Sequence, residues 1–397
     1  MTALRYSITD TLILAELVPR ADRGLRLALG GPLPARRFEL AARSTGALAA
    51  DADRTLSQRE LNRALLARQF LLGRGRLGLP KALKRIGGIQ AQYAPSMYVG
   101  LWSRLEGFER AKLTRALERR SVVQGTLLRA TIHLVSPADW WRFSIATKRE
   151  RKARWRRSHR GEPSDRTMDA AARRVRRRLG EGPLTRKEVD ELIGMGPAAV
   201  SGISLWIDIV RVPPSGTWDR RRADLYGDAE AWLGPKPELS EADATVELVR
   251  SYLRGFGPAA RGEIADWAGL PVGRVTAALG RIGPRRSLSE TGDELVDVSR
   301  AALPDPETPA PVRFLPVWDA TLLAHARRTN ILPEEHRARV FNVKTPQSVN
   351  TFLVDGQVAG TWKHERGRVV PEPFARLAAA DRKALAEEAE RLAELYA

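Results

Sequence analysis

The segment Gly182-Pro-Leu-Thr-Arg-Lys-Glu-Val189 returns downstream as Gly257-Pro-Ala-Ala-Arg-Gly-Glu-Ile264. Both segments carry Gly, Pro, Arg, Glu and a β-branched aliphatic residue at the same offsets. In each, we expect a short helix after the Pro, then a Gly-rich turn (Gly194-Met-Gly196 or Gly269-Leu-Pro271) and a second helix. Two such cores, about 75 residues apart, predict tandem helix-turn-helix modules. Gly-Pro starts are common, so a chance match stays open.

The region before this repeat has the element order of a winged helix. Ser57-Gln-Arg-Glu60 predicts a capping box at the start of a helix that stops near Gly73. A second helix is expected from Pro80 to the pair Gly87-Gly88. Residues 127–135 alternate and are rich in β-forming types, which predicts the strands of a hairpin. Residues 77–105 are a candidate third, weaker copy of the repeat.

The residue pattern changes from helix-like to strand-like after about residue 310. Val312-Arg-Phe-Leu-Pro-Val-Trp318, Asn350-Thr-Phe-Leu-Val354 and Gln357-Val-Ala-Gly-Thr-Trp362 read as strands, and Asp355-Gly356 is typical of a tight hairpin turn. The last stretch, from Pro373, predicts an amphipathic helix rich in Ala, Glu and Arg.

These patterns predict a mainly helical α+β chain with three tandem winged-helix modules and a small C-terminal β-barrel-like domain. The expected segments are a poorly ordered N-terminal extension (1–54), winged helix 1 with a Gln-x-Gln motif (55–145), a basic helical linker (146–180), winged helix 2 (181–240), winged helix 3 (241–305), a C-terminal β domain (306–371) and a C-terminal helix (372–397).

The charge balance points to a polyanionic partner. The chain has 397 residues, with 66 Lys and Arg against 47 Asp and Glu, a net charge of +19. Such a surplus creates a field that attracts nucleic acid. The alternative explanation for the positive charge is a composition bias, in which Arg occupies solvent-exposed positions without binding nucleic acid. The same two readings apply to the runs 148–157 and 173–178, which are either solvated helix faces or phosphate contacts.

Composition also excludes several kinds of chemistry. With no cysteine, the chain has no disulfide, thiolate zinc site, iron–sulfur cluster or Cys nucleophile. The five His residues show no helical i,i+4 pairing, so no metal and no cofactor are expected. No apolar run approaches the roughly 20 residues that span a bilayer. We therefore expect no membrane partner and a cytoplasmic location.

One short motif is a candidate for catalysis. Gln90-Ala-Gln92 follows a Gly-Gly helix stop. In an extended segment, residues i and i+2 point the same way, so both carboxamides would face one spot. Amides are poor general bases and suit only an easy reaction. Excision of an N7-alkylated purine is such a reaction, because the cationic base is already a good leaving group. The enzyme then needs to hold the lesion, stabilise the sugar cation and deliver water. The alternative is two glutamines that bond backbone groups in a loop.

Several motifs together carry a family resemblance. They are Gly87-Gly-Ile-Gln-Ala-Gln92, Arg129-Ala-Thr-Ile-His-Leu-Val135, Trp218-Asp-Arg-Arg-Arg-Ala-Asp-Leu-Tyr226, Leu315-Pro-Val-Trp-Asp319 and Val354-Asp-Gly-Gln-Val-Ala-Gly-Thr-Trp362. Over roughly residues 55–375 the chain resembles the YcaQ/AlkZ family of bacterial winged-helix DNA glycosylases. Any one motif alone would not be specific.

The resemblance implies a function and a site. It implies three winged helices and a β domain around a positively charged DNA cleft, and release of bulky or cross-linked N7-guanine adducts in DNA repair or genotoxin self-resistance. It implies that Gln90 and Gln92 are catalytic, as in the AlkZ branch. No lysine accompanies the motif, since Lys81 and Lys84 belong to the preceding helix. We therefore predict a monofunctional, monomeric, nucleoid-associated enzyme acting on double-stranded DNA. The rival is a non-catalytic winged-helix transcription regulator.

Other residues are predicted to contact DNA. Arg129, Thr131 and His133 alternate along an expected strand and would share a face, although His133 could equally be a satisfied structural histidine. A DNA-probing hairpin is a further family feature, which we place at residues 340–354. Its predicted DNA-binding residues are Arg339, Lys344 and Asn350. Asp319 is expected to be a buried cap, and Trp140 and Trp141 are expected to be core residues.

Overall fold

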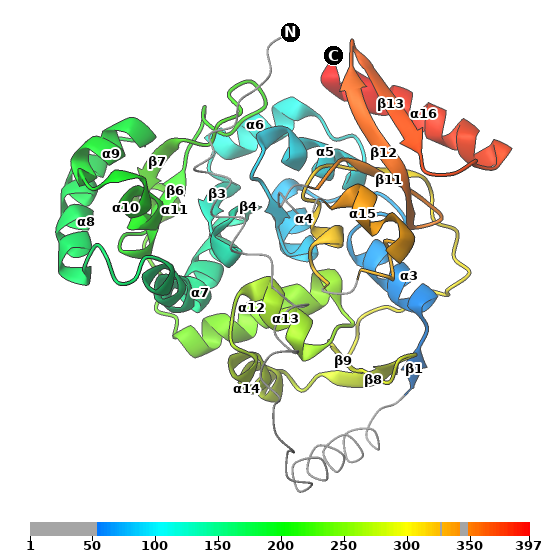
Figure 1. Cartoon of the computed structure of the whole chain (residues 1–397), viewed down its shortest axis with the longest axis horizontal. Helices are drawn as coiled ribbons and strands as arrows, with labels where there is room; N and C mark the ends of the chain where they lie inside the picture. The colour runs from blue at the N-terminus through cyan, green and yellow to red at the C-terminus, as the bar shows by residue number, and fades with distance from the viewer. Residues whose placement is uncertain (1–53, 326–327, 342–347) are drawn as a thin grey trace, which may run out of the picture.

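The computed structural model describes residues 54–325, 328–341 and 348–397. The predicted N-terminal extension, residues 1–54, lies outside the described residues except for Arg54, and so does Lys344. The described chain mixes α-helices with several antiparallel strand pairs and ends in a long helix (Figure 1). Across these ranges no helix combines the length and apolar character needed to cross a membrane.

Short helices dominate the region up to strand β4. Its elements are β1 (Thr55–Leu56), α3 (Gln58–Arg68), α4 (Leu79–Ile86), β2 (Ile89–Gln90), α5 (Ala94–Arg104), α6 (Arg110–Glu118), β3 (Val123–Thr126), the 3-10 turn η1 (Leu128–Ala130) and β4 (Ile132–Val135). The predicted capping box is confirmed, since the Ser57 hydroxyl accepts from the Glu60 amide at 3.1 Å and the Ser57 amide donates to the Glu60 carboxylate at 2.8 Å. Helix α3 ends before Gly73, because Phe70 already has a left-handed φ of 56°.

The β-rich run 127–135 forms a strand only in its second half. Strands β3 and β4 pair as an antiparallel hairpin, and η1 is the turn between them. Arg129 and Ala130 both have left-handed backbone, with φ of 50° and 62°. The prediction that Arg129 shares a strand face with Thr131 and His133 is therefore wrong, because Arg129 lies in the turn.

The basic linker folds as two long helices, α7 (Pro137–Ser158) and α8 (Asp165–Leu179). Helix α7 starts with a serine cap, in which the Ser136 hydroxyl accepts from the Asp139 amide at 3.2 Å. Its first turns contribute Trp140 and Trp141 to the main hydrophobic core, where they are 2% and 4% exposed. Their prediction as core residues is confirmed.

The two segments that repeat in the sequence have the same local structure. The first unit contains β5 (Leu184–Thr185), α9 (Arg186–Ile193), α10 (Gly196–Gly202), η2 (Ile203–Leu205), β6 (Ile209–Arg211), β7 (Leu225–Asp228) and α11 (Ala229–Leu233). The second contains α12 (Glu241–Phe256), α13 (Arg261–Ala268), α14 (Val272–Ile282), β8 (Arg285–Ser289) and β9 (Glu294–Asp297). Helices α9 and α13 end at left-handed glycines, Gly194 (φ 65°) and Gly269 (φ 68°), and each leads into a second helix. A helix pair followed by an antiparallel strand pair thus occurs twice.

The sheets join regions that are distant in sequence. A six-stranded sheet has the order β2-β4-β3-β6-β7-β5, so strands from the first region and the first repeat unit form one surface. Gln124 of β3 and Arg211 of β6 are the pair at this junction. Strand β1 runs parallel to β8 in a separate three-stranded sheet, which ties the start of the described chain to the second repeat unit.

The C-terminal region is an open sheet and a helix. Its elements are β10 (Arg313–Leu315), η3 (Ala320–Leu322), η4 (Glu334–His336), α15 (Arg337–Val340), β11 (Thr351–Val354), β12 (Gln357–Glu365), β13 (Arg368–Pro373) and α16 (Ala379–Tyr396). The expected β-barrel-like closure is wrong for the described residues, because the order β10-β11-β12-β13 leaves the two outer strands unpaired with each other. Helix α16 starts later than predicted because β13 extends to Pro373.

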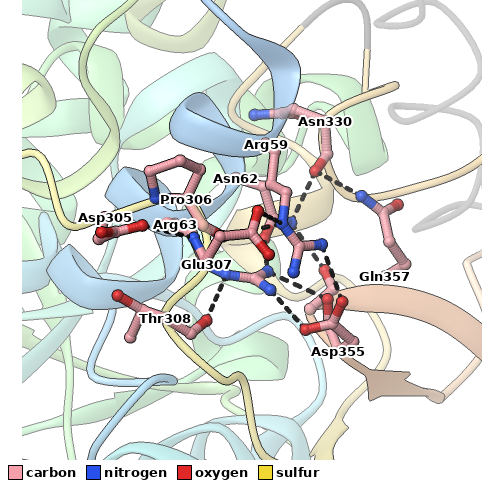
Figure 2. A network of polar contacts seen from close by, with 11 residues as sticks. Arg59, Asn62, Arg63, Asp305, Pro306, Glu307, Thr308, Asn330, Asp355 and Gln357 are labelled. Carbon is pink, nitrogen blue, oxygen red and sulfur yellow. Dashed lines mark hydrogen bonds and ion pairs between the residues drawn. The ribbon is translucent and has the colours of Figure 1, made fainter.

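The predicted tight turn at Asp355-Gly356 is confirmed. Hydrogen bonds connect this turn of the sheet to helix α3 (Figure 2). The Asn62 amide donates to the carbonyls of Gly356 at 2.8 Å and Asn330 at 2.7 Å. The Arg63 guanidinium, 1% exposed, donates to the Asp355 carboxylate. These contacts fix the β11–β12 turn on the first helix of the described chain.

Candidate active site

Two glycines bring the Gln-x-Gln segment against strand β4. Gly87 and Gly88 follow α4 with left-handed φ of 82° and 83°. A Cβ on Gly88 would lie 2.8 Å from Cγ1 of Val135, too close for any side chain. The tight turn places β2 beside β4, where Ile89 pairs with Leu134.

The strand register gathers polar side chains on one face. Gln90 lies directly opposite His133, and residues opposite each other in antiparallel strands share a face. The Ala91 amide donates to the Ile132 carbonyl at 2.7 Å, which continues the pairing past Gln90. Strand β2 ends at Gln90 and Gln92 lies in the bend that follows, so its side chain is placed by its own hydrogen bond to β4 rather than by strand alternation.

The Gln92 side chain is held at its oxygen. Oε1 accepts from the backbone amide of Ile132 at 3.1 Å. The Nε2 donors have no partner among the described residues, and the side chain is only partly buried. Gln92 therefore presents hydrogen-bond donors outward while its acceptor is committed to β4.

Gln90 is more enclosed. It is 6% exposed, and its carboxamide has no hydrogen-bond partner within the described ranges. The polar atoms of this carboxamide are not fully enclosed, so a water or ligand can reach them. The interpretation of both glutamines as loop residues that only bond backbone fits Gln92 in part and does not fit Gln90.

His133 is buried as a neutral imidazole. It is 4% exposed, and Nδ1 lies 3.0 Å from the Thr131 carbonyl, which can only accept. The pKa of His133 is lowered to about 3. Burial is the main cause, the charges of Arg129 and Arg151 also lower the pKa, and the hydrogen bond to Thr131 raises it in part. The ring therefore carries its proton on Nδ1 and none on Nε2 at neutral pH.

Two guanidinium groups beside this histidine have only backbone partners. Arg129 donates from the β3–β4 turn to the Trp267 carbonyl at the end of α13, at 2.6 Å. Arg151 of α7 donates to the Thr126 carbonyl, also at 2.6 Å. Burial lowers the pKa of each to about 10. Asp266 and Asp208 act on Arg129 and Arg151 from a distance, but among the described residues no carboxylate forms an ion pair with either guanidinium.

A pocket opens beside Gln92, between the first region and the first repeat unit. Its volume is about 650 Å³ including the open mouth. Arg211 lies in the wall, where Nη2 donates to the Thr126 hydroxyl at 3.3 Å and the guanidinium stacks over the Tyr226 ring at 5.1 Å. Ser204 of η2 adds a hydroxyl with no partner among the described residues. The pocket is polar, with aliphatic patches from α10 and β6.

Sequence reasoning missed several of these residues. Arg151 belongs to a basic run that was interpreted as either solvated or phosphate-binding, yet it is 7% exposed and bonded to the backbone. Tyr226 ends one of the motifs quoted above, but no pattern indicated its pocket. Arg211 carried no local signal, because its position depends on the β3–β6 junction.

The predicted DNA-binding residues of the C-terminal region are not next to the glutamines in sequence or sheet. Arg339 is exposed at the end of α15 and stacks over Phe374 at 3.9 Å. Asn350 is partly buried, where its Oδ1 accepts from the Val317 amide at 2.9 Å. A contact of either residue with DNA stays a prediction. Asp319 caps η3 as expected, and its carboxylate also forms a buried ion pair with Arg104.

Comparison with known proteins identifies the family. A protein-family model described as DNA glycosylase AlkZ-like matches residues 83–395. Among solved structures, Streptomyces sahachiroi DNA glycosylase AlkZ has a similar fold, with a TM-score of 0.73 and 20% identity over 86% of this chain and 97% of that chain. No curated protein matches the sequence. The chain therefore belongs to the AlkZ-like DNA glycosylase family.

Proposed function

We propose that this DNA glycosylase hydrolyses the N-glycosidic bond of N7-alkylated guanine in duplex DNA, including bulky or cross-linked adducts. The observation that carries the proposal is the set of neutral polar side chains along β4, where Gln90 lies opposite His133 and Gln92 accepts from the neighbouring Ile132 amide. N7-alkylguanine leaves as a neutral base without prior protonation, so neutral groups that orient water and substrate suffice. An unmodified purine would need an acid, and Gln90, Gln92 and His133, the last neutral at this depth, do not supply one.

Excision is tested on a duplex oligonucleotide that carries one N7-methylguanine. The expected result is an abasic site, detected as a strand break after mild alkali, with no break in the enzyme-free control. Borohydride should trap no covalent complex, because Lys81 and Lys84 point to solvent from α4. Tight binding without base release would contradict the enzyme and favour the transcription regulator.

The arrangement of modules is part of the same proposal. We interpret the region up to β4 and the two repeat units as three winged helices, with the hairpins β3–β4, β6–β7 and β8–β9 as their wings. The capping glutamates support the equivalence of the two units: Glu188 accepts from the Thr185 amide at 2.7 Å, and Glu263 accepts from the Ala260 amide at 3.0 Å. Such modules would serve DNA binding, and the family match supports a role in DNA repair; we include genotoxin self-resistance in the proposal.

DNA binding should depend on the exposed arginines of α8. Arg173, Arg176 and Arg177 are exposed and have no hydrogen-bond or ion-pair partner among the described residues. We expect the triple Gln variant to bind duplex DNA more weakly, and the slope of log K against log salt to become shallower by about 2 to 3. Fluorescence anisotropy at several salt concentrations measures the slope. The control pair Arg382→Gln with Lys383→Gln, on α16, should leave it unchanged; equal slopes for wild type and the triple variant would show that α8 does not touch phosphate.

The pocket beside Gln92 should accommodate the substituent of a bulky adduct. Ser204→Trp would fill part of this pocket from η2, on the repeat-unit side, and leaves both glutamines unchanged. We expect the variant to excise a bulky N7-guanine adduct at least tenfold more slowly, because the substituent loses its space, and N7-methylguanine at nearly the wild-type rate. Single-turnover kinetics on both substrates, with Ser204→Ala as the control, make the comparison. Loss of both activities together would argue against a pocket for the substituent.

A further inference from the structure

We infer that His133 accepts the proton of the attacking water and that Gln90 holds this water against it, an assignment that rests on the proposed glycosylase function. The two side chains lie directly opposite each other in the β2–β4 pair. In that relation the Cβ atoms are roughly 5 Å apart and on one face, which leaves room for one small molecule between the polar ends.

Both groups lack a partner where the water would lie. The Thr131 carbonyl fixes the His133 proton on Nδ1 at 3.0 Å, so Nε2 carries a free lone pair. Within the described residues, nothing bonds to Nε2 or to the Gln90 carboxamide, although the two residues are only 4% and 6% exposed. Neither Nε2 nor the carboxamide is fully enclosed, so one water can reach both, accept from the Gln90 amide and donate to Nε2.

The charges around His133 determine its protonation state and therefore its strength as a base. Arg129 from the turn and Arg151 from α7 act on the ring. Arg154 and Arg328 add positive charge near Arg129, which Asp266 partly offsets, and Asp208 does the same for Arg151. These cations and burial lower the pKa of His133 to about 3, so the ring is a weak base that is never protonated in advance. A weak base is sufficient only if the proton it receives is strongly acidic.

The reaction supplies such a proton. The C1′–N9 bond breaks first, and its electron pair neutralises the cationic guanine, which leaves an oxocarbenium ion on the sugar. The water oxygen then bonds to C1′ and becomes a strongly acidic oxonium. His133 Nε2 takes one of its protons and releases it to solvent, and the products are the neutral alkylated base, the abasic sugar and one proton. The Arg129 and Arg151 charges favour this release.

Gln92 has a different task in this arrangement. Its oxygen is held by the Ile132 amide, so only its donors face outward, toward the pocket. It is suited to hold an acceptor atom of the lesion, whereas Gln90 and His133 together offer a donor and an acceptor to a water. The two glutamines therefore differ in role although they are only two residues apart.

A double-mutant cycle on single-turnover excision of N7-methylguanine tests the assignment. His133→Phe keeps a ring but loses the acceptor, and Gln90→Met keeps the length but loses the donor. We expect each to slow excision at least tenfold with duplex affinity unchanged, and the double variant to be no slower than the slower single variant, because both remove the same water. His133→Gln, which restores an acceptor oxygen, should recover part of the loss.

The pH profile gives an independent reading. With the His133 pKa far below neutrality, the wild-type rate should be flat from about pH 5 to 9 rather than fall near an ordinary histidine pKa of about 6.5. A rate that drops through pH 6.5, wild-type excision by His133→Phe, or fully multiplicative losses in the double variant would each overturn the shared water. If the wild-type protein releases no base, the proposed function itself fails, which is a separate outcome.

Discussion

Gln92→Met is expected to slow excision of N7-alkylguanine by a factor of about 100 to 1,000, with duplex affinity nearly unchanged. Removal of one preorganised hydrogen-bond donor from a catalytic site has effects of about this size. Met keeps the length and volume of the side chain, so the pocket beside β4 retains its shape. What disappears is the outward-facing amide and the acceptor for the Ile132 backbone. Single-turnover kinetics separate this loss from a change in binding.

Two further variants show which atom of Gln92 matters. Gln92→Glu retains an oxygen for the Ile132 amide but has no amide donors. If the donors carry the activity, Glu should be nearly as slow as Met; if the anchor alone matters, Glu should be close to wild type. Gln124→Met is the matched control, because Gln124 is a buried glutamine of the same sheet whose amide donates to the Gly216 carbonyl at 2.6 Å. It should lower the melting temperature and leave the excision rate of the folded protein unchanged.

Local signals in the sequence predicted several helix ends and the segment that carries the glutamines correctly. The capping box at Ser57, the glycine stop after α4 and the extended segment at Gln90 all rest on preferences of a few neighbouring residues. Such preferences act before the chain packs, so they can be recognised without knowledge of distant partners. The helix pairs that follow Thr185 and Ala260 were predictable for the same reason.

The features that escaped prediction depend on distant contacts. Residues 127–135 favour strand throughout, yet the turn at Arg129 forms where its guanidinium meets the α13 carboxyl end, 138 positions away in sequence. The pocket exists only because β3 and β6 share a sheet, which no local pattern encodes. The C-terminal strands alternate as a barrel strand would, but alternation does not specify whether the outer strands of a sheet meet.

Asp319→Ala is expected to destabilise the protein by about 3 to 5 kcal/mol, since it leaves the Arg104 charge buried without a partner. Arg104 and Asp319 are 1% and 4% exposed, and the guanidinium donates to both carboxylate oxygens at 2.9 and 2.7 Å. The carboxylate also accepts from the Thr321 amide at 3.0 Å. Asp319→Asn keeps this cap but removes the charge, so its loss should be smaller than that of Ala. Urea denaturation followed by tryptophan fluorescence measures both.

The contribution of this ion pair should vanish in acid. Burial alone would raise the pKa of Asp319, but the Arg104 charge and the Thr321 hydrogen bonds outweigh it and hold the pKa below its ordinary value. A carboxyl group with a depressed folded pKa stabilises fully above its unfolded pKa of about 3.9, and this stabilisation is lost as the pH falls through the folded value. The difference between wild type and Asp319→Ala should therefore be constant from pH 7 to about 5 and shrink below about 4. Arg76→Ala, which breaks an exposed pair with Glu106, should leave the urea midpoint unchanged. Equal midpoints for wild type and Asp319→Ala at pH 7 would show that the buried pair contributes nothing, because the groups left behind would then have found water.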